Sequence, residues 1–176
     1  MALACLIVAA GCATRPDRTW TQRQATALHA QLLQLDRAVD AAEAGQVAKT
    51  AVEEAATLAH EYRAVRPAWL HNWFVNAGWR ARGLCYDWAN DLFPRLLALD
   101  LHSLELHLAV ARMDTPREHN CIVVTAHRQP FGEGVVLDAW RHSGRLWFGG
   151  VSKDKYPWQP LPPDRVAPEL EKLLAK

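Results

Sequence analysis

Three side chains have the types and the order needed for nucleophilic chemistry at a carbonyl group. Cys85 lies in the run RGLCYDWANDLF, His119 in REHNCIVV and Asp138 in GVVLDAW. A thiol is an effective nucleophile when a neighbouring imidazole and a helix N-terminus favour the thiolate. A carboxylate on the far ring nitrogen fixes the tautomer of that imidazole. The set predicts cysteine-dependent acyl transfer, with Cys85 as nucleophile, His119 as base and Asp138 as orienting acid.

A helix is expected to position Cys85. From Leu84 onward, apolar residues recur at the spacing of one helix face, at Trp88, Leu92, Leu96 and Leu99. Cys85 is therefore predicted in the first turn, where unpaired backbone N–H groups and the positive end of the helix dipole stabilise a thiolate. The same N–H groups could hold a developing oxyanion. Asp91, four residues before Arg95, is expected to form an exposed pair with it.

Strands are expected to position the other two side chains. After Asp100 the apolar period changes to two, which predicts a half-buried strand from Leu104 to Val110. Turn-rich segments separate three further predicted strands, at about 120–127, 134–141 and 145–151. Short links between consecutive strands favour an antiparallel meander. His119 would stand at the entrance to one strand and Asp138 on the next.

The N-terminal third is expected to be a helical hairpin. Apolar positions predict a helix from about 20 to 43, and a second helical series starts on a new phase after Gly45. Pro67 ends this second helix because the residue before proline avoids the helical region. A short helix then ends at Gly78, and VAPELEKLLAK is expected to close the chain as a helix. We predict an α+β fold, with the hairpin at 17–66 and a catalytic domain at 67–176 forming one unit.

Composition indicates a folded chain without a nucleic-acid partner. The 176 residues are 50% hydrophobic and 22% charged, which suits one hydrophobic core. The formal net charge is +1, and no run of Lys or Arg forms a stripe suited to phosphate backbones.

The first twelve residues have the outline of a bacterial export signal. MALACLIVAAGC is almost wholly apolar and ends in small residues before Cys12, which resembles a lipobox. The resemblance implies that residues 1–12 are a signal peptide and lipidation segment, that Cys12 carries the lipid, and that the protein is tethered to a membrane surface of the bacterial cell envelope, facing the periplasm or the exterior. The alternative is a short buried or disordered N-terminus with two incidental cysteines.

The three motifs together resemble the transglutaminase-like (papain-like) superfamily of cysteine proteases and acyltransferases. RGLCYDWANDL, HNCIVV and VVLDAW carry the resemblance, over about residues 83–140. It implies a nucleophile-bearing helix packed on an antiparallel sheet, and a Cys85–His119–Asp138 triad acting through a thioester on a peptide or protein amide. Whether water or an amine resolves the thioester, which separates a hydrolase from a transferase, stays open, as does the substrate.

The resemblance also implies a further oxyanion donor upstream of the cysteine. Asn72, Asn76 and Trp79 are the candidates. Trp79 is favoured because its indole N–H lies in the loop just before Cys85, although a packing role suits a large aromatic residue equally well.

Competing interpretations remain for each of these residues. Cys85 could be a buried structural cysteine, and Asp138 could cap a turn or pair with Arg141. Cys121 shares a strand face with His119 but is more simply a core residue. No metal site is expected, since the histidines and cysteines lack ligand spacing, and no cofactor is expected either. The opposing hypothesis for the whole chain is a catalytically silent envelope lipoprotein that acts as a binding or structural module.

Overall fold

A five-stranded antiparallel sheet forms the centre of the molecule. The computed structural model describes residues 17–174, and in this range the sheet order is β4-β3-β2-β1-β5. The strands are β1 (Leu104–Ala111), β2 (His119–Ala126), β3 (Val135–Asp138), β4 (Trp147–Gly150) and β5 (Trp158–Pro160). The predicted meander of four strands is confirmed. The fifth strand was not predicted, and it pairs with β1 across Ala109 to Ala111.

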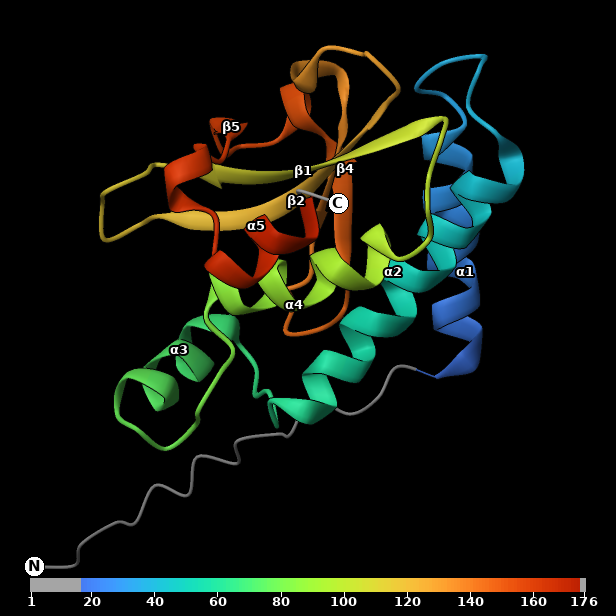
Figure 1. Cartoon of the computed structure of the whole chain (residues 1–176). Helices are drawn as coiled ribbons and strands as arrows, with labels where there is room; N and C mark the ends of the chain where they lie inside the picture. The colour runs from blue at the N-terminus through green and yellow to red at the C-terminus, as the bar shows by residue number, and fades with distance from the viewer. Residues whose placement is uncertain (1–16, 175–176) are drawn as a thin grey trace, which may run out of the picture.

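Five helices complete the described part of the chain. They are α1 (Arg18–Leu32), α2 (Ala41–Glu61), α3 (Ala68–Asn76), α4 (Cys85–Leu97) and α5 (Pro168–Leu174). In Figure 1 α1 and α2 lie side by side as a hairpin, while α4 and α5 run beneath the long strands β1 and β2. This arrangement confirms the predicted α+β class, the hairpin and a helix that begins at Cys85 and packs on the sheet.

The sheet is covered on both faces, which explains why all eight residues of β2 are buried. On one face Ile122 and Val124 join the same apolar cluster as Trp88 and Leu92 of α4 and the inner residues of the hairpin. On the other face Cys121 lies in a second cluster, to which Val123, Val136, Val151 and Trp158 also belong. The central strand therefore holds its side chains in fixed positions on both sides.

The hairpin turn lies earlier than the sequence predicted. The first helix ends at Leu32 and the second begins at Ala41, so Gly45 lies inside a helix rather than at the turn. Asp40 is the physical reason, because its side chain accepts hydrogen bonds from the N–H groups of Ala42 and Glu43 and so caps the second helix. A Cβ at Gly45 would make only an ordinary contact with the His29 ring, at 3.9 Å, so the packing of α2 on α1 does not require glycine here.

Two other expectations need correction or lie outside the described residues. The predicted Asp91–Arg95 pair is wrong: Asp91 contacts Arg82, and Arg95 contacts Glu54 and Glu61 of α2 instead. Residues 1–12 with the lipidation candidate Cys12 lie outside the described range. Within 17–174, no helix has the length and apolar character needed to span a membrane.

Candidate active site

His119 and Asp138 form a buried hydrogen-bonded pair. His119 begins β2 and Asp138 ends β3, and the two antiparallel strands bring the imidazole Nε2 within 2.7 Å of Asp138 Oδ2. The exposed fraction is 3% for His119 and 1% for Asp138, so the bond is shielded from water. Because Asp138 engages Nε2, the ring nitrogen left over is Nδ1. That nitrogen is buried and has no hydrogen-bond partner among the described residues.

Cys85 lies against the chain on either side of His119. Its thiol donates a long hydrogen bond to the carbonyl oxygen of Glu118, with Sγ and O 3.7 Å apart, and the side-chain amide of Asn120 lies 3.8 Å from Sγ. Cys85 is partly accessible, unlike Cys121. The structure therefore brings the three predicted residues into one place, with the thiol beside the histidine.

The electrostatics of the pair favour a protonated imidazole. Burial lowers the pKa of His119, but the hydrogen bond with Asp138 and the neighbouring Cys85 thiol outweigh burial and raise the pKa to about 9. Burial likewise raises the pKa of Asp138, yet the hydrogen bond with His119 and the charge of Arg141 outweigh it and leave that pKa lowered. An imidazole with a raised pKa takes a thiol proton more readily.

Arg141 holds the far side of Asp138. Its backbone N–H and its Nε donate to the two carboxylate oxygens of Asp138, at 2.9 and 3.0 Å. The two terminal nitrogens of Arg141 donate to Asp154, which also accepts from the indole of Trp158. Asp138 thus both caps the turn and pairs with Arg141, the two structural roles considered from sequence, while it also holds His119.

Aromatic rings enclose His119. Its ring centroid lies 4.6 Å from that of Trp140, 4.8 Å from Tyr156 and 5.3 Å from Trp158. These contacts restrict rotation of the imidazole and exclude water from the pair. Tyr156 and Asp154 were not identified from sequence, because the segment before β5 has no periodic pattern and only its fold brings it to the sheet.

The start of α4 is fixed by its neighbours. Asp87 reaches back to accept hydrogen bonds from the N–H groups of Gly83 and Leu84. His71 of α3 is buried and hydrogen-bonds the carbonyl of Arg82 through Nε2. Gly83 has a φ of +125°, and a Cβ there would lie 2.1 Å from the His71 ring. Only glycine fits this approach, so the Arg-Gly before the cysteine sets the entry to the helix.

Trp79 lies among the aromatic residues of α3. Its ring stacks on Phe74 and meets Trp73 edge-on, and 63% of the residue is exposed. Its role as an oxyanion donor stays a prediction. Asn120 is a candidate that the sequence reasoning missed, since its side-chain amide already lies at the Cys85 sulfur. Its position directly after the histidine was the available signal.

Cys121 is placed as a core residue. It is 2% exposed and lies in the cluster on the second face of the sheet. Burial raises the pKa of the Cys121 thiol well above its ordinary value, which disfavours the thiolate. Within residues 17–174, no group of three or more His, Cys, Asp or Glu side chains is arranged to hold a metal ion.

Comparisons with known proteins add no assignment. No family model, no curated protein and no solved structure matches the chain.

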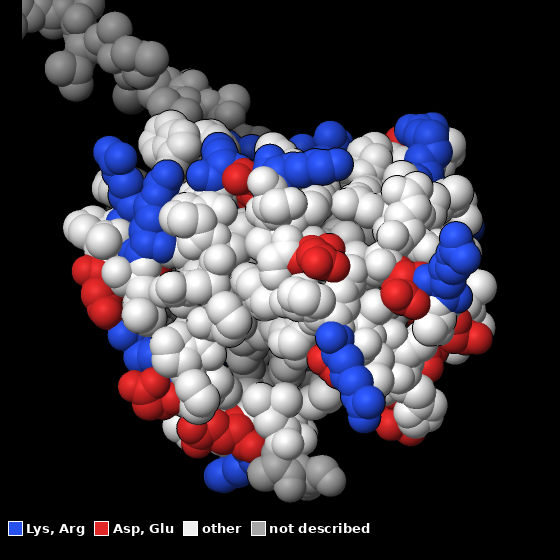
Figure 2. Space-filling view, turned by 90° about the horizontal axis from the view of Figure 1, so that it is seen from above, with Lys and Arg blue, Asp and Glu red and all other residues white. Residues whose placement is uncertain are grey.

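On the face shown in Figure 2, much of the surface is uncharged and the basic side chains occupy several separate places.

Proposed function

We propose that the protein is a cysteine-dependent amide or peptide hydrolase or acyltransferase with a transglutaminase-like, papain-like arrangement. The observation that carries the proposal is the buried hydrogen bond between His119 Nε2 and Asp138, which leaves Nδ1 without a partner among the described residues, while Cys85 contacts the residues on either side of His119. A nucleophile, a base and an orienting acid in contact are the geometry that this chemistry needs. The order of the three on a helix and two strands supports the same family.

In the proposed reaction His119 transfers two protons, one from the thiol and one from water or the second amine. The imidazole Nδ1 first takes the thiol proton, and the Cys85 thiolate, paired with the imidazolium, then attacks the carbonyl carbon of an amide. The Asn120 side-chain amide and the backbone N–H groups at the start of α4 are suited to stabilise the oxyanion. The carbon–nitrogen bond then breaks, and the leaving amine takes the proton from His119. Water or a second amine, deprotonated by His119, resolves the thioester and restores the thiol.

The proposal includes a tether. A lipid on Cys12 would hold the domain at a membrane surface of the bacterial cell envelope, with peptide or protein amides as substrates. Mass analysis of the mature N-terminus after expression in a bacterial host tests this part. Acylated Cys12 as the first residue supports the tether, and an unmodified Cys12 still preceded by Gly11 rejects it.

Thiol labelling tests the catalytic proposal. The full chain is treated with iodoacetamide near neutral pH, and peptide mass mapping follows alkylation of Cys85 separately from the other cysteines. We expect fast modification of Cys85 in the wild type and a rate lower by about tenfold or more in His119→Ala, because the thiolate loses its proton acceptor and its cationic partner.

A second histidine of the sheet provides the matched control. His107 on β1 is half-buried and hydrogen-bonds Thr125, away from Cys85. His107→Ala should leave the labelling rate unchanged. Slow labelling of Cys85 that His119→Ala does not alter would reject the enzyme and favour the second candidate.

The second candidate is a silent binding or structural module of the envelope. One observation favours it: Trp69, Trp73 and Trp79 are 67%, 53% and 63% exposed, so α3 and the loop after it present an aromatic surface. Large exposed aromatic surfaces commonly mark interaction sites. This candidate does not explain why a partly accessible thiol contacts the two residues that flank His119 of the buried His119–Asp138 pair.

A further inference from the structure

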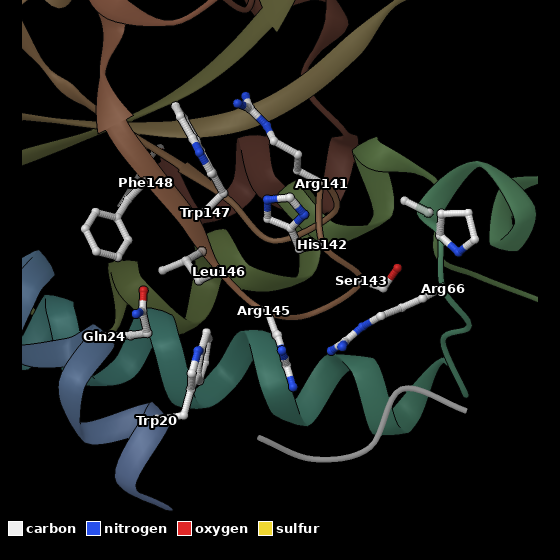
Figure 3. A pocket seen from close by; sticks show the side chains of 12 residues that line it. Trp20, Gln24, Arg66, Arg141, His142, Ser143, Arg145, Leu146, Trp147 and Phe148 are labelled. Carbon is white, nitrogen blue, oxygen red and sulfur yellow. The ribbon is translucent and has the colours of Figure 1, made fainter. Parts of the chain in front are cut away.

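A cavity of about 520 Å³ lies between the hairpin and the segment that follows Asp138. Figure 3 shows that Trp20 and Gln24 of α1 form one side, and that residues 141–148 form another. Arg66, just before α3, closes a third side. The volume is in the range of cavities that bind small molecules. Cys85 and His119 are not among the lining residues.

Two arginines at this cavity have no acidic partner among residues 17–174. The Nε atoms of Arg66 and Arg145 are buried, and each lacks a hydrogen-bond partner in residues 17–174. No described ion pair includes either side chain, and the cavity lining holds no Asp or Glu. A buried guanidinium donor without an acceptor costs free energy, which an added acceptor would recover.

The two cations also act on each other. Burial lowers the pKa of Arg66, and the positive charge of Arg145 lowers it further. Figure 3 shows the two side chains extending toward the same region above α2. Like charges held together without an anion between them are unfavourable, so a bound anion would relieve the repulsion.

Aromatic rings supply flat apolar walls. Trp20 lies under Arg145, with the guanidinium carbon 5.6 Å from its ring centroid. Trp147 and Phe148 of β4 line the opposite part, and Arg141 stacks on Trp147 at 3.6 Å. The cavity therefore combines free cations with surfaces suited to a planar ring.

The backbone that carries both arginines is fixed. Ser143 Oγ donates to the carbonyl of Val65, which ties the residue before Arg66 to the turn before Arg145. Gly144 is pressed against α2, because a Cβ there would lie 2.3 Å from the Cβ of Ala59. The Ser143–Val65 hydrogen bond joins residues 78 positions apart in the sequence and so fixes the two segments relative to each other. A site whose donors are fixed before binding loses less entropy when a ligand binds.

We propose that this cavity binds a small organic anion, a carboxylate or phosphate joined to a planar ring. The anionic oxygens lie between Arg66 and Arg145, and the ring packs against Trp20 and the β4 aromatics. A carboxylate and a phosphate are recognised by the same chemistry, since both accept paired hydrogen bonds from guanidinium groups. Arg141, which holds Asp138, also lines the cavity, but Cys85 and His119 do not, and the proposal does not depend on the proposed catalysis.

Binding of three probes to the full chain tests the proposal. Phenyl phosphate, phenylacetate and inorganic phosphate are titrated while binding is followed by calorimetry and by the indole N–H signals in NMR spectra, with the Trp20 signal assigned from Trp20→Phe. We expect saturable binding of an aryl anion, tighter than inorganic phosphate, with a shift of the Trp20 signal. A preference for phenyl phosphate or for phenylacetate identifies the anion.

Arginine variants locate the site. Arg66→Gln and Arg145→Gln should each weaken aryl-anion binding by about tenfold or more, the effect of losing a charged hydrogen bond. Arg23→Gln, an exposed arginine of α1 outside the cavity, should bind as the wild type does. The proposal is overturned if no probe saturates, if the Trp20 signal does not move, or if both cavity variants bind normally. Because the readout is binding, a Cys85→Ala protein should give the same result, and failure of the catalytic proposal leaves this outcome unchanged.

Discussion

At the scale of single residues, the proposed chemistry depends most on which ring nitrogen of His119 binds Asp138. Asp138 binds Nε2, so Nδ1 is the ring nitrogen left without a partner among residues 17–174. Sequence could supply the three residue types and their order. It could not supply Asp154, which reaches the site only through Arg141 and a fold that returns the chain from β4 to β5. Contacts of this kind depend on tertiary structure and leave no local pattern.

The stability of the fold should depend on pH through this pair. The raised pKa of His119, about 9, means that its contribution is fully present below the unfolded value of about 6.5 and is lost as pH rises toward 9. Asp138 has a lowered pKa, so its contribution is present above its unfolded pKa of about 3.9 and is lost as pH falls below that value. We expect the free energy of unfolding to fall by a few kcal/mol between pH 6.5 and 9.

Urea unfolding at several pH values measures this dependence. His119→Gln should flatten the curve above pH 6.5 relative to the wild type. If the free energy of unfolding of the wild type changes above pH 6.5 with the same slope as that of the variant, the folded protein does not retain the His119 proton as we infer.

Loss of Arg141 should cost more than loss of a surface arginine. Arg141→Met leaves the buried carboxylates of Asp138 and Asp154 without their shared cation, and breaking a buried pair costs about 3 kcal/mol or more. Arg165→Met breaks an exposed pair with Asp114 and should cost under about 1 kcal/mol. Chemical denaturation of the two variants compares these costs directly, and equal losses would contradict the structural role of Arg141.

At the scale of elements, the start of α4 is set by one glycine. Gly83→Ala forces a Cβ into the His71 ring, so we expect a loss of about 2 kcal/mol or more in the free energy of unfolding and slower labelling of Cys85. Gly78→Ala is the matched control. Gly78 also has a positive φ, +76°, but nothing lies within 4 Å of a Cβ there.

The control separates backbone strain from the steric contact. We expect Gly78→Ala to cost about 1 kcal/mol. Equal effects of the two variants on stability and on labelling would mean that the contact with His71 does not position the nucleophile.

The elements also show where sequence reasoning succeeds. Period-two and helical patterns predicted β1 to β4 and α4 because their apolar faces meet a core. The hairpin turn was misplaced because Gly45 was interpreted as a break, whereas Asp40, an N-cap residue, was the stronger start signal. β5 has only three residues and lies in a segment with four prolines, at 157, 160, 162 and 163, so no alternation could reveal it.

At the scale of the whole molecule, we expect the hairpin and the catalytic part to unfold together. Leu28 of α1, Leu58 of α2, Trp88 of α4 and Ile122 of β2 belong to one buried cluster. Far-UV circular dichroism, which follows the helices, and tryptophan fluorescence should therefore give one coincident urea transition.

A core variant checks the same point. Leu58→Ala should lower both midpoints together and cost about 2–4 kcal/mol, since the side chain is fully buried. A helical signal lost before the fluorescence signal would indicate that the hairpin is a separate unit.

The short fifth strand has a consequence for solubility. A long free strand at the side of a sheet offers unpaired amide and carbonyl groups to other chains and promotes aggregation. Here β5 covers part of β1, and Pro160 at its end has no N–H to offer. On β5 an added chain would find a ladder only three residues long, although β5 does not reach Leu104–His107 of β1. Strand-by-strand association at β5 itself is therefore disfavoured.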